Sequence, residues 1–514
     1  MAKNCCQRKH YWFLIREQKR YIWEKLVLLV ALGIATYFRL VRIDTTWMSP
    51  DQSTLLSLAM DIASGERFPL VANQSSAGFA HPALPVYLYA FPILLTHQVV
   101  SAAVLTALLN VLSVGIGYLY ARRYLGQSAS LVFLALYTLS PWSVHFSRLI
   151  WNPVIIPFFA ALALCLLTVL VTGDQRFVVW VGIALALIGM FHSHLVSLSL
   201  IIAVGAIGLL FHRRIRIWWA AIAFLFIALS FAPYVEAQTA SFPLRVPTGE
   251  PVQVNIAPFL IAGDLISARG LFLAVEGWKT AEILLRGWLW ISIIWLGLIT
   301  LRYGRKAWEN SISAPQSSRI VLFFWIIGPL VALTYHRHYL QHHYFLFLYP
   351  AAYLAMAALV EDLGVCLDKF LLPRLPTKTR QIYPIIGKSV LMLLLGVVSF
   401  WSFLVSRSTL RQEWAQTCLQ ERHVRAAVEV IRDNIEQLQI PNLVVLSDGI
   451  DALSSTFGFI SALLPSDLSI RFVRIGNGIL VPRAPALYFV AGRDEPTEAL
   501  LSQAGRLLSV LELV

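Results

Sequence analysis

The chain has 514 residues, of which 58% are apolar and 13% are charged, and its mean hydropathy is +0.69. Because soluble domains carry about 25% charged residues, this composition excludes an ordinary soluble domain and predicts an integral membrane protein. The formal net charge of +13 would suit a nucleic-acid-binding protein, but most basic residues lie in short segments between apolar runs, where they orient membrane spans, so we expect no nucleic-acid partner.

Eleven apolar segments are expected to span the membrane. A hydrocarbon core about 30 Å thick requires roughly 20 apolar residues, and in lipid every backbone polar group must be bonded within the chain, which makes such segments helical. In chain order they are residues 26–43, 98–121, 128–145, 153–172, 177–191, 195–211, 217–234, 283–301, 320–335, 343–360 and 387–405. We therefore predict a basic cytoplasmic N-terminus over residues 1–25 and an all-α polytopic membrane domain over residues 26–406.

The segment His81–Thr96 decides which loops share a side of the membrane. It is apolar but short for a span, and it contains Pro82, Pro85 and Pro92. If it lies at the interface, 22 Lys and Arg residues fall on the cytoplasmic side and nine on the outer side. If it crosses, fifteen of those 22 move outside, against the rule that basic loops stay in the cytoplasm. We therefore predict interfacial helices in the first outer loop.

Residues 407–514 differ in character from the spans and are predicted to form a small α/β domain outside the cytoplasm. A helical pattern covers Glu421–Leu438, and short β-rich runs follow. These runs are Leu443–Leu446, Leu468–Ile475 and Leu487–Val490, before a second helical stretch over Glu495–Leu508.

The first outer loop contains the acid of most interest, Asp51. It follows Ser49-Pro50 and precedes an amphipathic stretch over residues 53–64, so this segment resembles a helix start. One interpretation of Asp51 is a first-turn acid that is stabilised by the helix dipole. The other is a functional acid next to the bilayer.

Further polar residues gather at the outer ends of the predicted spans. His145 and Arg148 are three residues apart, which suits either an interfacial cation or a phosphate ligand. His192 and His194 could be polar interface residues or two metal ligands that lack an acidic partner. The turn over residues 336–343 has four histidines and Arg337, a density that favours a binding function.

Taken in order, several motifs resemble the polyprenyl-phosphate-sugar-dependent transferases of the GT-C fold, in particular the glycosyltransferase family 39-like membrane proteins related to protein O-mannosyltransferases and aminoarabinose transferases. The motifs are Arg39, Arg42 and Asp51 in the first loop, Gly65-Glu-Arg-Phe-Pro69, His81-Pro82, residues 118–126, Ser140-Pro-Trp with Ser147-Arg148 and Trp151-Asn152-Pro153, and residues 343–350. The resemblance covers about residues 26–405 and rests on the order and shared sidedness of these motifs.

The resemblance implies an inverting glycosyltransferase that moves a sugar from a polyprenyl-phosphate donor to a hydroxyl acceptor (a lipid, glycan or protein) at the outer face of the cell membrane. Asp51 would be the catalytic base. The donor phosphate would be bound by Arg148, Arg337 and His343, with His81 and Arg42 behind them. Other expected pocket residues are Gln52, His145, Asn152, His192, His194 and His342.

The chain departs from the family pattern at two positions. Gln52 and Asn152 stand where relatives carry acids, some of which hold a divalent cation. We therefore expect no metal or other cofactor. Two alternatives stay open, namely a transporter or lipid flippase and a non-catalytic relative of the family.

Overall fold

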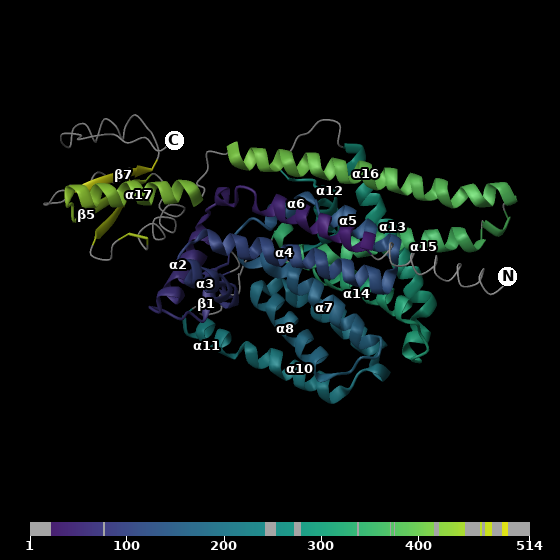
Figure 1. Ribbon diagram of the computed structural model, residues 1–514. Helices are drawn as coiled ribbons and strands as arrows, with labels where there is room; N and C mark the ends of the chain where they lie inside the picture. The colour runs from purple at the N-terminus through teal and green to yellow at the C-terminus, as the bar shows by residue number, and fades with distance from the viewer. Residues whose placement is uncertain are drawn as a thin grey trace, which may run out of the picture.

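The computed structural model describes residues 22–75, 78–241, 253–271, 279–336, 339–370, 372–374, 376–415, 421–447, 463–464, 468–474 and 486–491. Most of these residues form long helices that lie side by side, with shorter elements gathered at the two ends of the bundle (Figure 1). The helices are apolar all round, as expected of segments that face both lipid and one another.

Every predicted span falls on a helix of this bundle. The helices are 22–40, α4 (Val100–Tyr120), α5 (Gln127–Tyr137), α7 (Ile156–Val171), α8 (Phe177–Ser193), α9 (Leu200–Leu210), α10 (Ile217–Ser230), α13 (Lys279–Trp308), α14 (Ala314–Ala332), α15 (Tyr349–Phe370) and α16 (Thr377–Ala415). Within the described part of the chain, seven helical stretches are long and apolar enough to cross a membrane. The polytopic all-α fold class is confirmed.

One predicted span is interrupted. Residues 128–145 form two helices, α5 and α6 (Pro141–Phe146), rather than one. Pro141 has no backbone N–H and therefore begins a helix instead of continuing one. The break leaves the Thr138 carbonyl without a helical partner, and the buried Arg39 side chain donates to it at 2.9 Å and to Ser143 Oγ at 3.0 Å.

The loop predicted to be the first on the outer side folds as a compact layer at one end of the bundle (Figure 1). Its elements are η1 (Ile43–Thr45), α2 (Pro50–Ser64), β1 (Val71–Gln74), β2 (Ala80–Pro82) and α3 (Leu84–Thr96). The strands pair antiparallel, and α3 packs against both α2 and α4. With 13 residues, α3 is about 20 Å long, and it contains Pro92. The first loop thus contains short helices, as predicted, and their place at the membrane interface stays a prediction.

Shorter elements connect the remaining helices. In chain order they are η2 (Ala121–Leu125), η3 (Asn152–Ile155), η4 (Leu195–Ser199), η5 (His212–Arg214), α11 (Ala232–Ser241), β3 (Gln253–Val254), α12 (Ala257–Ser267), β4 (Tyr335–His336), η6 (His342–Leu348) and η7 (Leu372–Arg374). β3 and β4 pair antiparallel.

The C-terminal region combines one helix with a parallel sheet, as predicted. α17 (Glu421–Leu438) precedes β5 (Asn442–Ser447), β6 (Ser469–Arg474) and β7 (Ala486–Ala491), in the sheet order β6-β5-β7. This region lies at the same end of the bundle as α2 and α3 (Figure 1), and α17 contacts η1. The predicted helix over Glu495–Leu508 lies outside the described residues.

Candidate active site

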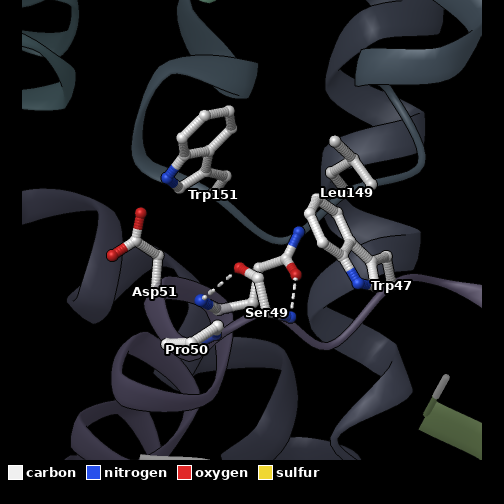
Figure 2. Close-up of a pocket in the computed structure, with 7 residues that line it drawn as sticks. Trp47, Ser49, Pro50, Asp51, Leu149 and Trp151 are labelled. Carbon is white, nitrogen blue, oxygen red and sulfur yellow. Dashed lines mark hydrogen bonds between the residues drawn. The ribbon is translucent and has the colours of Figure 1, made fainter. Parts of the chain in front are cut away.

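A pocket of about 270 Å³ opens between the start of α2 and the segment that follows α6. Figure 2 shows its lining residues, and the carboxylate of Asp51 lies on the side of Trp151. The lining consists of Trp47, Ser49, Pro50, Asp51, Gln52, Leu149 and Trp151. The predicted acid therefore lies in a hollow between two tryptophans, which offer the flat apolar faces on which a sugar ring can lie.

Local sequence explains why Asp51 occupies the mouth of this pocket. Ser49 is the N-cap of α2, and Pro50 occupies the first helical position, which needs no N–H. The Gln52 amide oxygen accepts from the Ser49 N–H at 2.6 Å, while Ser49 Oγ accepts from the Gln52 N–H at 3.5 Å. This capping box assigns the buried Gln52 a structural role and places Asp51 in the first turn, where the helix dipole favours a negative charge.

The carboxylate of Asp51 is the end of a hydrogen-bonded chain of amides. Asn73 in β1 donates its Nδ2 proton to Asp51 Oδ1 at 3.1 Å. Asn152 at the start of η3 in turn donates to Asn73 Oδ1 at 2.7 Å. Asn73 and Asn152 are both buried. Sequence reasoning singled out Asn152 but missed Asn73, whose only signal was an amide in a short strand, where asparagine is uncommon.

Arg148 lies next to the pocket but is turned toward the end of helix 22–40. Its guanidinium is buried and donates to Val41 O at 2.8 Å, Arg42 O at 2.9 Å and Arg39 O at 3.2 Å. Longer bonds reach Phe38 O and Thr45 Oγ1. Arg148 therefore caps the carbonyls that a helix leaves unpaired at its C-terminus. Phosphate binding by Arg148 stays a prediction that would require the release of these bonds.

Arg42 contributes mainly through its backbone. It adopts a left-handed conformation with φ of 47°, which turns the chain from helix 22–40 into η1. Its carbonyl accepts from both Arg148 and the Thr45 hydroxyl. The role of the Arg42 side chain in phosphate binding stays a prediction.

Three of the predicted histidines come together behind Trp151. The ring centroids of His81 and His194 are 5.0 Å apart, and those of His194 and His343 are 5.8 Å apart. His343 in turn contacts Trp151, with ring centroids 4.1 Å apart. β2, the end of α8 and η6 thus place imidazoles from three distant parts of the sequence against one wall of the pocket.

His81 is neutral at pH 7 in this structure, because burial lowers its pKa to about 4. Its Nδ1 atom is buried without a hydrogen-bond partner among the described residues. An imidazole of this kind can accept a proton when an anion binds next to it, because a nearby negative charge favours the protonated form.

The remaining histidines predicted for the site make their ring contacts with other partners. His192 is within 3.0 Å of Ser230 Oγ and packs on Phe231, toward α10. His342 stacks on Trp142, on which His145 also packs, and its Nε2 lies 3.8 Å from Asp264 Oδ2. Arg337 lies outside the described residues. Within the part of the chain that the structure describes, no group of three His, Cys, Asp or Glu side chains is arranged to hold a metal ion.

Comparisons with known proteins give matches at the level of structure. No family model and no curated protein matches the chain. ArnT from Cupriavidus metallidurans in the apo state aligns with 95% of this chain and 89% of its own, at 14% identity and a TM-score of 0.55. The structure of ArnT bound to undecaprenyl phosphate aligns with 88% of this chain and 90% of its own, at 14% identity and a TM-score of 0.52.

A third match is the archaeal oligosaccharyltransferase AglB from Archaeoglobus fulgidus, in complex with an inhibitory peptide and a dolichol-phosphate. It aligns with 88% of this chain and 64% of its own, at 14% identity and a TM-score of 0.51. ArnT and AglB are glycosyltransferases of the GT-C fold. The chain is therefore a multi-pass membrane protein with the GT-C fold, as its sequence motifs predicted.

Proposed function

We propose that the protein is an inverting glycosyltransferase that moves a sugar from a polyprenyl-phosphate donor to a hydroxyl acceptor at the outer face of the cell membrane. One observation carries the proposal: the carboxylate of Asp51 stands at the N-terminus of α2 in a pocket walled by Trp47 and Trp151. Two GT-C structures similar to this chain contain undecaprenyl phosphate or dolichol-phosphate, which supports the donor class.

In this reaction Asp51 takes the proton of the acceptor hydroxyl as its oxygen attacks the anomeric carbon. The bond between that carbon and the phosphate oxygen breaks, and its electron pair leaves with the polyprenyl phosphate. Attack from the side opposite the leaving group inverts the configuration. The amide donors behind Asp51 hold the carboxylate in place, so that less reorganisation is needed during the reaction.

The leaving phosphate gains negative charge and needs donors or cations beside it. His81 and His343 lie behind Trp151 and are the described candidates for this role. His81 starts neutral, since burial lowers its pKa to about 4, and would take up a proton as the phosphate charge develops. Arg337 is the further candidate from the sequence. In this proposal the N-terminus lies in the cytoplasm, and the first outer loop and the C-terminal region lie outside.

The test is turnover of undecaprenyl phosphate that carries a radiolabelled hexose or pentose by the purified full-length protein in lipid nanodiscs, with a membrane and cell-envelope extract of the source cells added as the supply of hydroxyl acceptors. Transfer of the label to an acceptor, with release of free undecaprenyl phosphate, is expected for the wild type with at least one such donor. Asp51→Asn keeps the size of the side chain, and we expect it to lower turnover at least 100-fold with the unfolding temperature unchanged. Asp61→Asn, in the same helix but outside the pocket lining, is the matched control and should retain activity.

The alternatives predict other outcomes. A transporter or flippase would move the intact lipid-linked sugar across the bilayer without cleaving it. A non-catalytic relative would bind undecaprenyl phosphate and leave every donor intact. Full turnover by Asp51→Asn would remove this residue from the mechanism.

A further inference from the structure

The chain Asn152–Asn73–Asp51 is directional, because each amide group has a donor end and an acceptor end. Asn152 donates to Asn73 Oδ1, and this contact leaves the Asn73 NH2 group to face Asp51. If the Asn73 amide were reversed, its oxygen would face a carboxylate oxygen and its NH2 group would face the NH2 group of Asn152. Both contacts would be repulsive.

The backbone around Asn152, the first residue of this hydrogen-bonded series, is held by two side chains. The Tyr89 hydroxyl of α3 donates to the Trp151 carbonyl at 2.7 Å. The Asn110 side chain of α4 donates to the Val154 carbonyl at 2.9 Å. Asn152, which lies between these two attachment points, is buried with 1% of its surface exposed. The backbone on both sides of Asn152 is therefore held in place, while the Asn152 Oδ1 atom is buried without a hydrogen-bond partner among the described residues.

We infer that Asn73 and Asn152 are positioning residues that present an N–H donor to Asp51 and orient its carboxylate for proton abstraction. The inference rests on the proposed function, in which Asp51 is the base. Asp51 forms no ion pair with a described residue, and the Asn73 amide is the polar side chain that contacts it.

The same geometry gives a physical reason for asparagine at position 152. An ionised aspartate there would offer only acceptors where the structure uses a donor, so the Asn73 amide would have to reverse to meet it. Its oxygen would then face Asp51. The new carboxyl group would be buried, which disfavours its charged form, and only its protonated form would keep a donor at this position. An amide at position 152 is therefore part of this site rather than the loss of an acid.

The test compares Asn73→Ala, Asn152→Asp and Asn434→Ala in the full-length protein. Asn434 in α17 is the matched control, because its amide donates to the Val430 carbonyl of its own helix and has no bond to Asp51, Asn73 or Asn152. Turnover of the radiolabelled donor is measured over a range of donor concentrations, so that kcat and KM are obtained separately. The unfolding temperature of each variant is recorded so that the kinetics refer to folded protein.

We expect Asn73→Ala to lower kcat about tenfold and to leave the KM for the donor near its wild-type value, because the carboxylate of Asp51 loses the donor that orients it. Asn152→Asp should also lower kcat, and Asn434→Ala should keep the wild-type kcat. Wild-type kcat in the first two variants, or an equal loss in Asn434→Ala, would overturn the inference. Wild-type turnover by Asp51→Asn would instead refute the proposed function, whatever the two asparagine variants show.

Discussion

The sequence predicts Arg148 as a phosphate ligand, whereas in the structure its guanidinium caps the carbonyls at the end of helix 22–40. Three of its hydrogen bonds are 3.2 Å or shorter, to the carbonyls of Arg39, Val41 and Arg42. A bond to a charged donor contributes about 1.5 kcal/mol or more. Loss of all three in Arg148→Met is therefore expected to lower the free energy of unfolding by about 4–5 kcal/mol.

Arg148→Lys should have an intermediate effect. The ammonium group keeps the charge but lacks the planar fork that reaches several carbonyls at once. If it restores one of the three short bonds, the loss is about 3 kcal/mol. Arg176→Lys is the matched control, because Arg176 forms an exposed ion pair with Asp174, and such pairs contribute little to stability.

Unfolding of the detergent-solubilised protein can be followed by the fluorescence of its 16 tryptophans. The folded fraction of each variant is then assayed for binding of undecaprenyl phosphate. We expect Arg148→Lys to unfold at a lower temperature than the wild type and to bind this lipid normally once folded. Wild-type thermal stability together with weakened lipid binding would show that Arg148 is a phosphate ligand and that its role as a helix cap is minor.

Two further predictions concern stability. Burial lowers the pKa of His81 in the folded protein to about 4, whereas an unfolded histidine binds a proton near pH 6.5. The free energy of unfolding should therefore decrease as the pH is lowered from about 6.5 to about 4, because only the unfolded state binds the proton in this range. His81→Gln should make the dependence of the unfolding temperature on pH shallower, and equal slopes in the two proteins would contradict this account. A Cβ atom at Gly328 would lie 2.9 Å from Ala203 Cβ and 3.0 Å from its Cα and N atoms, so Gly328→Ala should push α14 away from α9 and cost about 1–3 kcal/mol. Gly364→Ala, with nothing within 4 Å, is the control, and an equal loss in both variants would refute the close packing.

The elements of the fold were predictable because each depends on short stretches of sequence. Continuous apolar runs indicate spans, and the Ser49-Pro50-Asp51 sequence indicates the start of α2, which begins at Pro50. The same holds for the tail, where α17 has the predicted bounds Glu421–Leu438. The break at Pro141 was missed because the apolar run continues through it, and hydropathy does not register the loss of a backbone donor.

The site was predictable only where one residue type indicates one chemistry. Asp51 stood out as an acid in a membrane-adjacent loop, and it lines the pocket. Asn73 could not be predicted as a site residue, because its role depends on a tertiary contact with Asn152, 79 residues away. The hydrogen bonds of Arg148 could not be predicted from the sequence either. An arginine after a span normally faces water or phosphate, whereas Arg148 donates to backbone carbonyls at the C-terminal end of another helix.

The contact between α17 and η1 ties the tail of the protein to the approach to its pocket. Ile43 of η1 packs against the apolar cluster that contains Val424 and Val428 of α17, while Arg148 donates to the Thr45 hydroxyl. The segment that leads from helix 22–40 to Trp47 therefore contacts both the bundle and the C-terminal region. A protein shortened before α17 would keep only the contacts of this segment with the bundle.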